Sequence, residues 1–84
     1  MIDYTKGENL ASDIICDGLR VSTASFPREE YYGSGKDAMI ETWVFGDKEK
    51  GFESKQYIHE RIRTREKAII FHNKLVMRLR RYNL

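Results

Sequence analysis

The sequence predicts a small α+β domain, in which an antiparallel sheet of three to four strands is packed by one C-terminal helix. Two observations support this fold class. Apolar and polar residues alternate with a period of two in several short segments of the first sixty residues, which is typical of strands. The period changes to that of a helix at about residue 65. Since the chain has 84 residues, we expect residues 1–84 to form a single small domain with a modest core.

The first two strands are predicted to form a hairpin at Asp17-Gly18. Asp-Gly is a favoured two-residue turn, because the central positions of that turn take positive φ. Residues 19–25 then alternate, which points one set of side chains inward. An alternative stays open, in which residues 8–16 form a short helix that ends at the glycine. Residues 1–12 have no clear period and are predicted to be a loose N-terminal arm or a short edge segment.

The next two strands are predicted within residues 37–46 and 52–63. Residues 37–46, DAMIETWVFG, are largely apolar on both faces, which indicates a central strand. Residues 52–63, FESKQYIHERIR, alternate with mixed polarity and predict an edge strand. The segments that precede these strands, residues 27–36 and 46–51, are polar and rich in turn residues.

The C-terminal helix is predicted from about Arg65 to Arg81. Thr64 is a suitable N-cap and Glu66 favours the first turn. A helical wheel gives an apolar arc roughly 160° wide, broad enough to cover a sheet. This arc contains Ala68, Ile69, Phe71, His72, Leu75, Val76, Leu79 and Tyr82, and the opposite side contains Lys67, Lys74, Arg78 and Arg81.

Charge is unevenly distributed along the chain. Residues 1–53 contain six Lys/Arg and eleven Asp/Glu, a net charge of −5, whereas residues 54–84 contain nine and two, a net charge of +7. Two explanations stay open. The halves attract each other within the fold or between subunits, or the basic half offers a face to an anionic partner.

The cysteine count and the N-terminus predict a cytoplasmic protein. Cys16 is the only cysteine and has no partner for an internal disulfide, which suits a reducing compartment. We expect no signal peptide, because the first residues have no basic and apolar regions of the required kind. No apolar run approaches the ~20 residues of a membrane span. One cysteine and two histidines are too few for a structural zinc site, so we expect no metal and no cofactor.

The histidines are interpreted as structural residues. His72 lies inside the apolar arc, so we predict a core histidine that is hydrogen-bonded to the sheet, with Glu41 and Thr42 as possible partners. His59 lies among charged residues of the predicted edge strand, and a metal pair with His72 would lack a local carboxylate cluster. No nucleophile motif accompanies either residue, so we predict no catalytic residues and no enzyme.

Two groups of residues are candidates for contacts with partners. Tyrosine rings can stack on a base, and lysine and arginine can bind phosphate. We therefore predict a ligand-binding set of Tyr31, Tyr32, Lys36, Arg61, Arg63, Arg78 and Arg81. We predict contacts within a homo-oligomer, or with a partner, at Ile70 and Met77 on the outer helix face and at Tyr82 at the end of the helix.

Three segments together resemble a family of small uncharacterised proteins of tailed phages and bacteria: RVSTAS (20–25), IETWVFG (40–46) and RIRTREKAIIFH (61–72). Members carry a V-S-T strand, an E-T-M-V-F strand and a T-x-E-x-A-x-x-x-H helix start. The matching positions here are Val21, Ser22, Thr23, Glu41, Thr42, Val44, Phe45, Thr64, Glu66, Ala68 and His72.

The resemblance covers about residues 19–75 and has departures. Residues 27–30 replace the loop that usually follows the V-S-T strand in the family, and Trp43, Ile62 and Phe71 replace other residues of its pattern. The resemblance implies an α+β fold and a phage setting, in the cytoplasm of an infected bacterial host, but no mechanism.

These observations predict a non-enzymatic phage accessory protein that acts by binding. The expected target is a host protein, as for an inhibitor of a host factor or of a defence system, or an anionic nucleotide signal that the protein sequesters. Two alternatives stay open: a small nucleic-acid-binding module with a basic face, and a minor structural or assembly protein.

Overall fold

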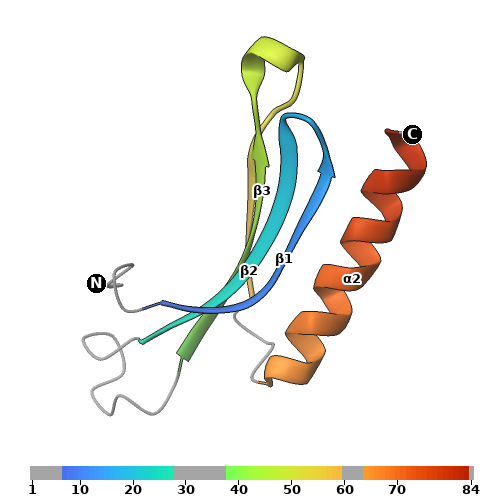
Figure 1. Cartoon of the computed structure of the whole chain (residues 1–84). Helices are drawn as coiled ribbons and strands as arrows, with labels where there is room; N and C mark the ends of the chain where they lie inside the picture. Colours follow the sequence, from blue (N-terminus) through green and yellow to red (C-terminus); the bar gives the residue numbers. More distant parts are fainter. Residues whose placement is uncertain (1–6, 28–37, 60–63, 84) are drawn as a thin grey trace.

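The computed structural model describes residues 7–27, 38–59 and 64–83, and it shows one four-stranded antiparallel sheet with one helix packed on it. Figure 1 shows helix α2 along one face of the sheet, with its axis beside strand β1. The α+β fold class is therefore confirmed. The elements are β1 (Glu8–Cys16), β2 (Leu19–Pro27), β3 (Ala38–Gly46), the short 3-10 helix η2 (Lys48–Lys50), β4 (Lys55–Ile58) and α2 (Arg65–Tyr82).

The predicted hairpin joins β1 and β2, but its turn has a different geometry from the one expected. Of the two turn residues, Gly18 alone has a positive φ, +87°. Among the described residues, every residue with a positive φ is a glycine. A register shift between Ile14 and Cys16 precedes the turn. Such a bulge increases the local twist of the strand pair, so the turn does not need two residues with positive φ to supply that twist.

Residues 8–12 belong to edge strand β1, which agrees with the alternative of an edge segment, so the prediction of a loose arm is wrong for them. The short-helix alternative for residues 8–16 is wrong for the same reason. The sequence hides this strand because a second register shift, between Asn9 and Ala11, interrupts its alternation. Residues 1–6 lie outside the described residues.

Strand β3 is central, as predicted, because it pairs with β2 on one side and with β4 on the other. Strand β4 is the predicted edge strand, although its bounds differ from the predicted residues 52–63, of which residues 60–63 lie outside the described residues. It starts at Lys55, since Phe52–Ser54 still belong to the connection that follows η2, and it ends at Ile58. A short edge strand that begins with a lysine is a poor template for pairing with another chain.

Helix α2 begins and ends close to the predicted residues. The side chain of Thr64 accepts a hydrogen bond from the backbone N–H of Lys67 at 3.3 Å, and the helix ends one residue later than predicted, at Tyr82. The backbone N–H of Asn83 donates to the carbonyl of Leu79 and closes the last turn. Within the described segments, no helix combines the length and the hydrophobicity needed to cross a membrane.

The core lies between α2 and the inward face of the sheet. It consists of Ile15, Leu19, Val21, Val44, Leu75 and Val76. Polar contacts join α2 to the edge strand beside it: Arg65 forms an ion pair with Glu8, and Arg80 donates to the backbone carbonyl of Ile14 at 3.3 Å. Because that carbonyl lies on an edge strand, the Arg80 contact helps to protect the open edge of the sheet.

Candidate functional site

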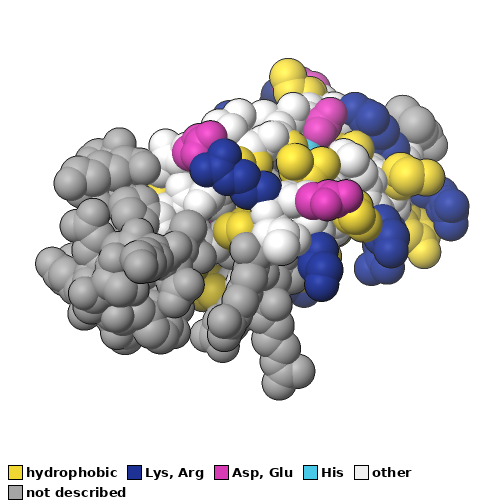
Figure 2. Space-filling model, turned by 90° about the horizontal axis from the view of Figure 1, so that it is seen from below, with side chains coloured by type: hydrophobic (Ala, Val, Ile, Leu, Met, Phe, Trp, Pro, Cys, Tyr) yellow, Lys and Arg dark blue, Asp and Glu magenta, His cyan; other side chains and the backbone are white. Residues whose placement is uncertain are grey.

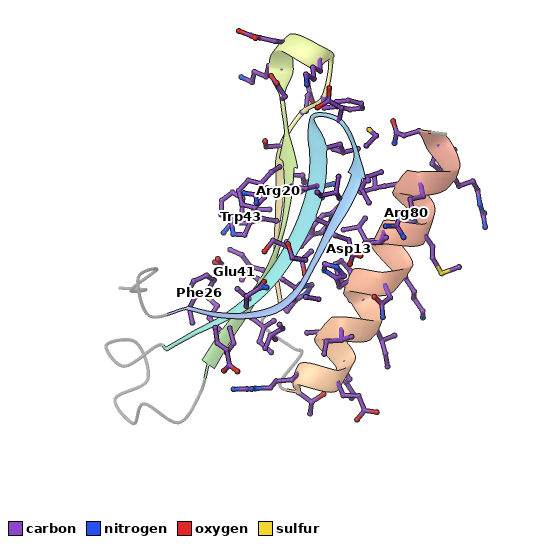
Figure 3. The ribbon with its side chains drawn as sticks, viewed as in Figure 1. Asp13, Arg20, Phe26, Glu41, Trp43 and Arg80 are labelled. Atoms are coloured by element: carbon purple, nitrogen blue, oxygen red, sulfur yellow. The ribbon has the colours of Figure 1, made fainter. Side chains whose placement is uncertain are left out.

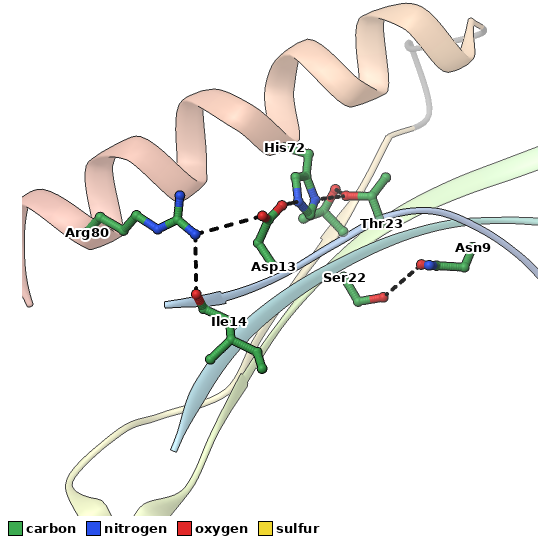
Figure 4. Close-up of polar contacts among 8 residues, drawn as sticks. Asn9, Asp13, Ile14, Ser22, Thr23, His72 and Arg80 are labelled. Carbon is green, nitrogen blue, oxygen red and sulfur yellow. Dashed lines mark hydrogen bonds and ion pairs between the residues drawn. The ribbon is translucent and has the colours of Figure 1, made fainter. Parts of the chain in front are cut away.

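A chain of hydrogen bonds crosses the interior between the sheet and α2 (Figure 4). Its members come from different elements of the sheet and from the helix: Asp13 from β1, Thr23 from β2, Thr42 from β3, His59 directly after β4, and His72 from α2. The contacts are Asp13 Oδ2 to His72 Nε2 at 2.7 Å, His72 Nδ1 to Thr23 Oγ1 at 2.8 Å, Thr23 Oγ1 to Thr42 Oγ1 at 2.7 Å, and Thr42 Oγ1 to His59 Nε2 at 2.8 Å. We call these five residues the interior chain.

The strand alternation places these polar side chains inside. Thr23 follows Leu19 and Val21 on the inward face of β2, and it pairs directly with Thr42 of β3. Thr23, Thr42 and His72 have no exposed surface. Buried polar groups are costly unless they are hydrogen-bonded, and no buried side-chain nitrogen or oxygen of the described residues lacks a partner. The interior chain is thus a satisfied network.

Asp13, His72 and Thr23 have the connectivity of an acid–histidine–hydroxyl triad, but not its chemistry. A triad needs a hydroxyl that can reach a substrate. The Thr23 hydroxyl is completely buried and already contacts Thr42. The arrangement therefore orients the imidazole and joins α2 to the sheet, and it presents no nucleophile to solvent.

His59 is the end of the interior chain and is almost buried, contrary to its predicted place among charged residues. Its ring packs edge-on against Phe71 of α2, with centroids 4.5 Å apart. Burial lowers the pKa of His59 from its ordinary value, because an imidazolium loses hydration in an apolar environment. Each histidine directs a ring nitrogen at a threonine, and the described residues contain no cluster suited to a metal ion.

The face of the sheet that points away from α2 carries a column of aromatic and cationic side chains (Figure 3). The rings of Trp43 and Phe45 stack with centroids 5.7 Å apart, and the Arg20 guanidinium lies 4.5 Å from the Phe45 ring centre. Below this column, the buried carboxylate of Glu41 accepts hydrogen bonds from Trp43 and Gln56. Trp43 and Arg20 both contact the Phe45 ring, which is 37% exposed.

The outer surface of α2 carries the predicted cations Lys67, Lys74, Arg78 and Arg81. At 3.6 residues per turn these four positions fall within about 60° of one another, along about 21 Å of the helix. We call them the basic stripe. Figure 2 shows Lys and Arg side chains gathered on the helix side of the molecule, with hydrophobic side chains among them. A hollow of about 220 Å³ is lined by Lys74, Met77, Arg78, Arg81 and Tyr82.

The cations of α2 divide into two kinds. Arg65 and Arg80, on the side next to β1, contact the carboxylates of Glu8 and Asp13. In the part of the chain that the structure describes, the four side chains of the basic stripe form no ion pair with a carboxylate. The helix therefore uses some cations for internal contacts and directs a separate line of positive charge at solvent.

Two residues of the predicted ligand-binding set lie within the described residues, and the structure brings them together. Arg78 and Arg81 line one hollow, and two of the predicted oligomer contacts, Met77 and Tyr82, line the same hollow. Ile70, Met77 and Tyr82 are exposed by 48%, 65% and 78%. The other predicted ligand residues, Tyr31, Tyr32, Lys36, Arg61 and Arg63, lie outside the described residues.

The partners of His72 differ from the expected ones. Its ring contacts Asp13 and Thr23, whereas Thr42 is one hydrogen bond further along and Glu41 points to the other face of the sheet. A signal for this network was present in the sequence. Polar residues stand among the inward-facing apolar positions of the strands, and such residues need a buried partner.

No protein-family model, no curated protein and no solved structure matches this chain.

Proposed function

We propose that this protein is a non-enzymatic binding protein whose anionic partner lies along the basic stripe of α2. The observation that carries the proposal is the separation of the helix cations into paired ones and the four side chains of the stripe. Lysine and arginine side chains that face solvent in a line create a continuous positive potential. A phosphate-bearing ligand suits them, since guanidinium groups bind phosphate through two parallel hydrogen bonds.

The length of the stripe favours an extended ligand over a single nucleotide. About 21 Å of helix corresponds to roughly six steps of one nucleic-acid strand at 3.4 Å each. The partial negative charge of the helix C-terminus opposes an anion there, but it amounts to only about half an elementary charge. Lys74, Arg78 and Arg81 together outweigh it. We therefore propose nucleic acid as the first ligand class and a nucleotide held in the hollow beside Tyr82 as the second.

Binding of a fluorescently labelled 20-mer, single-stranded or duplex, tests the proposal by anisotropy at several salt concentrations. Four contacted phosphates predict a slope of log K against log salt of about −3. The double variant Arg78→Ala/Arg81→Ala should make that slope shallower by about 1.5 units. Arg65→Ala is the matched control, because Arg65 lies on the same helix but is paired with Glu8.

The outcomes separate the ligand classes. If the protein binds the 20-mer and the double variant binds it more weakly, the result supports a nucleic-acid partner. If a mononucleotide displaces the probe at equal phosphate concentration, the result supports a nucleotide bound in the hollow. No binding of either probe at 50 mM salt would refute the proposal. A phage accessory role against a host factor or defence system is proposed from the family resemblance, and the unpaired positive charge is compatible with it.

Self-association is proposed as a second property of the same helix. Ile70 and Met77 are exposed beside the basic stripe, and small domains often gain burial by forming oligomers. Four cations on one face would repel a second copy, so we expect association to increase with salt. Light scattering over a hundredfold range of concentration tests this, and a constant monomer mass at high salt would exclude it.

A further inference from the structure

The interior chain contains four hydrogen-bond contacts, and each contact needs one hydrogen. The two threonine hydroxyls supply two hydrogens. Because the Asp13 carboxylate accepts at one end, His72 donates to it from Nε2. Neutral His72 therefore has no hydrogen on Nδ1, which must accept from Thr23. Thr23 must then accept from Thr42, and Thr42 must accept from His59.

With both rings neutral, all four contacts are therefore satisfied in one direction only, from His59 towards Asp13. This direction determines the tautomers, because His59 and His72 must both carry their hydrogen on Nε2. Among the described residues, Thr23 Oγ1 and Thr42 Oγ1 make no other hydrogen bond.

A proton on His72 reverses the hydroxyls. Its Nδ1–H then donates to Thr23, Thr23 donates to Thr42, and Thr42 donates to Nε2 of His59, which must carry its own hydrogen on Nδ1. A proton on His59 instead leaves the original direction intact. The two singly protonated states differ only by the shift of three hydrogens along three short hydrogen bonds, with no movement of heavier atoms.

A second proton does not fit. If both rings were imidazolium, His59 and His72 would each donate inward, and five hydrogens would compete for four contacts. One threonine hydroxyl would then be buried without an acceptor, which is unfavourable. We propose that His59 and His72 share a single proton through Thr42 and Thr23, so that the interior chain is a proton relay across the sheet.

The surroundings determine where that proton resides. His72 is faced by the Asp13 carboxylate from β1, and Arg80 of α2 lies 3.8 Å from the same carboxylate. Thr23 of β2 and Thr42 of β3, which contact the rings, are uncharged. His59 is faced by Thr42 and by Phe71, whose ring also contacts Tyr57. A proton on His72 lies beside the Asp13 carboxylate, and the tautomer of His59 reports that proton from the β4 edge of the same face of the sheet.

Nitrogen-15 NMR of the imidazole rings tests the relay, since the shifts of Nδ1 and Nε2 distinguish both tautomers and the imidazolium. In the wild-type protein at pH 8 we expect both rings neutral with hydrogen on Nε2. On acidification we expect His59 to change to the Nδ1–H tautomer as His72 becomes protonated. The second proton should bind at least about tenfold more weakly than it does in a variant with a broken chain.

Thr42→Val breaks the chain in its middle, and the two histidines should then titrate as independent single sites. Thr42→Ser keeps the hydroxyl and should retain the coupling, and Ser22→Ala removes a hydroxyl on the other face of β2 as a control. A wild-type His59 that keeps its Nε2–H tautomer while His72 is protonated would overturn the proposal. That wild-type measurement decides the matter even if Thr42→Val fails to fold.

Discussion

His72 and Asp13 are 59 residues apart in the chain, yet the Nε2 of His72 lies 2.7 Å from the Oδ2 of Asp13. This contact joins α2 to the edge strand β1 at one defined place. Apolar packing alone would allow the helix several positions along the sheet, because Leu and Val side chains have no directional partners. The buried imidazole is satisfied in only one of them, between Asp13 and Thr23. The polar contacts therefore specify where the helix lies.

Thr23→Val tests the contribution of the interior chain to stability. Valine has nearly the same shape but no hydroxyl, so His72 Nδ1 and Thr42 Oγ1 would each lose a partner in a region without exposed surface. We expect a loss of about 1–3 kcal/mol in the free energy of unfolding, measured with urea. Ser22→Ala on the opposite face should change it by less than about 0.5 kcal/mol. Equal effects of the two substitutions would contradict this explanation.

The stability of the protein should decrease in mild acid because of His59. Its pKa is lowered by burial, so below the unfolded pKa of about 6.5 the unfolded chain binds a proton at this residue and the folded protein does not. The free energy of unfolding therefore falls as the pH is lowered through about 6.5, by at most about 1.4 kcal/mol per pH unit. The decline continues down to the folded pKa.

Urea unfolding at several pH values between 8 and 5 measures this effect. His59→Gln keeps a donor that can reach Thr42 but removes the titrating ring, so its stability should depend less steeply on pH than that of the wild type. If the two proteins show the same dependence, His59 is not its source.

Arg80 and Arg81 are neighbours with different expected roles. Arg80 donates to the Ile14 carbonyl and lies near Asp13, whereas Arg81 belongs to the basic stripe. We expect Arg80→Ala to lower the free energy of unfolding by about 1 kcal/mol, a value kept small by the partial exposure of the contact. Arg81→Ala should leave stability within about 0.5 kcal/mol and weaken binding of a nucleic-acid probe. If Arg81→Ala lowered stability and Arg80→Ala weakened binding of the probe, the roles of these two arginines would be the reverse of those proposed.

The two glycines with positive φ should differ in their response to alanine. Gly18 and Gly51 have φ values of +87° and +85°, so alanine costs about 1 kcal/mol of backbone strain at either position. A Cβ at Gly18 would also lie 2.7 Å from Cδ of Lys50, whereas one at Gly51 meets no atom within 4 Å. Thermal unfolding should therefore show a larger loss for Gly18→Ala, because Lys50 must move away from its ion pair with Asp17. Similar losses would show that Lys50 moves without cost.

Much of the fold was predictable from local patterns. The alternation in residues 19–25 and 38–45 gave β2 and β3, and the Thr64 cap located the start of α2 to the residue. Strand β1 was obscured by its two register shifts, because each shift reverses the alternation on which such a prediction depends. Strand β4 starts three residues later than predicted, since Phe52–Ser54 belong to the connection that follows η2.

The candidate sites were predictable to different degrees. A basic helix face follows from the helical period, so the basic stripe could be read directly from the sequence. The hydrogen bonds of the interior chain could not be predicted in this way, although each of its residues could be identified in the sequence. Its residues come from three strands, the position directly after a fourth strand and a helix, and their contacts depend on strand registers that no single segment encodes.

By itself, the sequence determined the classes of elements, the burial of one helix face and the line of cations on the other, because these follow from periods within a single segment. Only the tertiary structure decided which residues the buried histidine contacts. Hydrogen bonds require atoms to meet within about 3 Å, and that proximity arises only after strands and helix have packed. Periodicity is a property of neighbouring residues in one segment. The contacts of Asp13, Thr23 and His72 depend instead on how segments far apart in the chain align with one another.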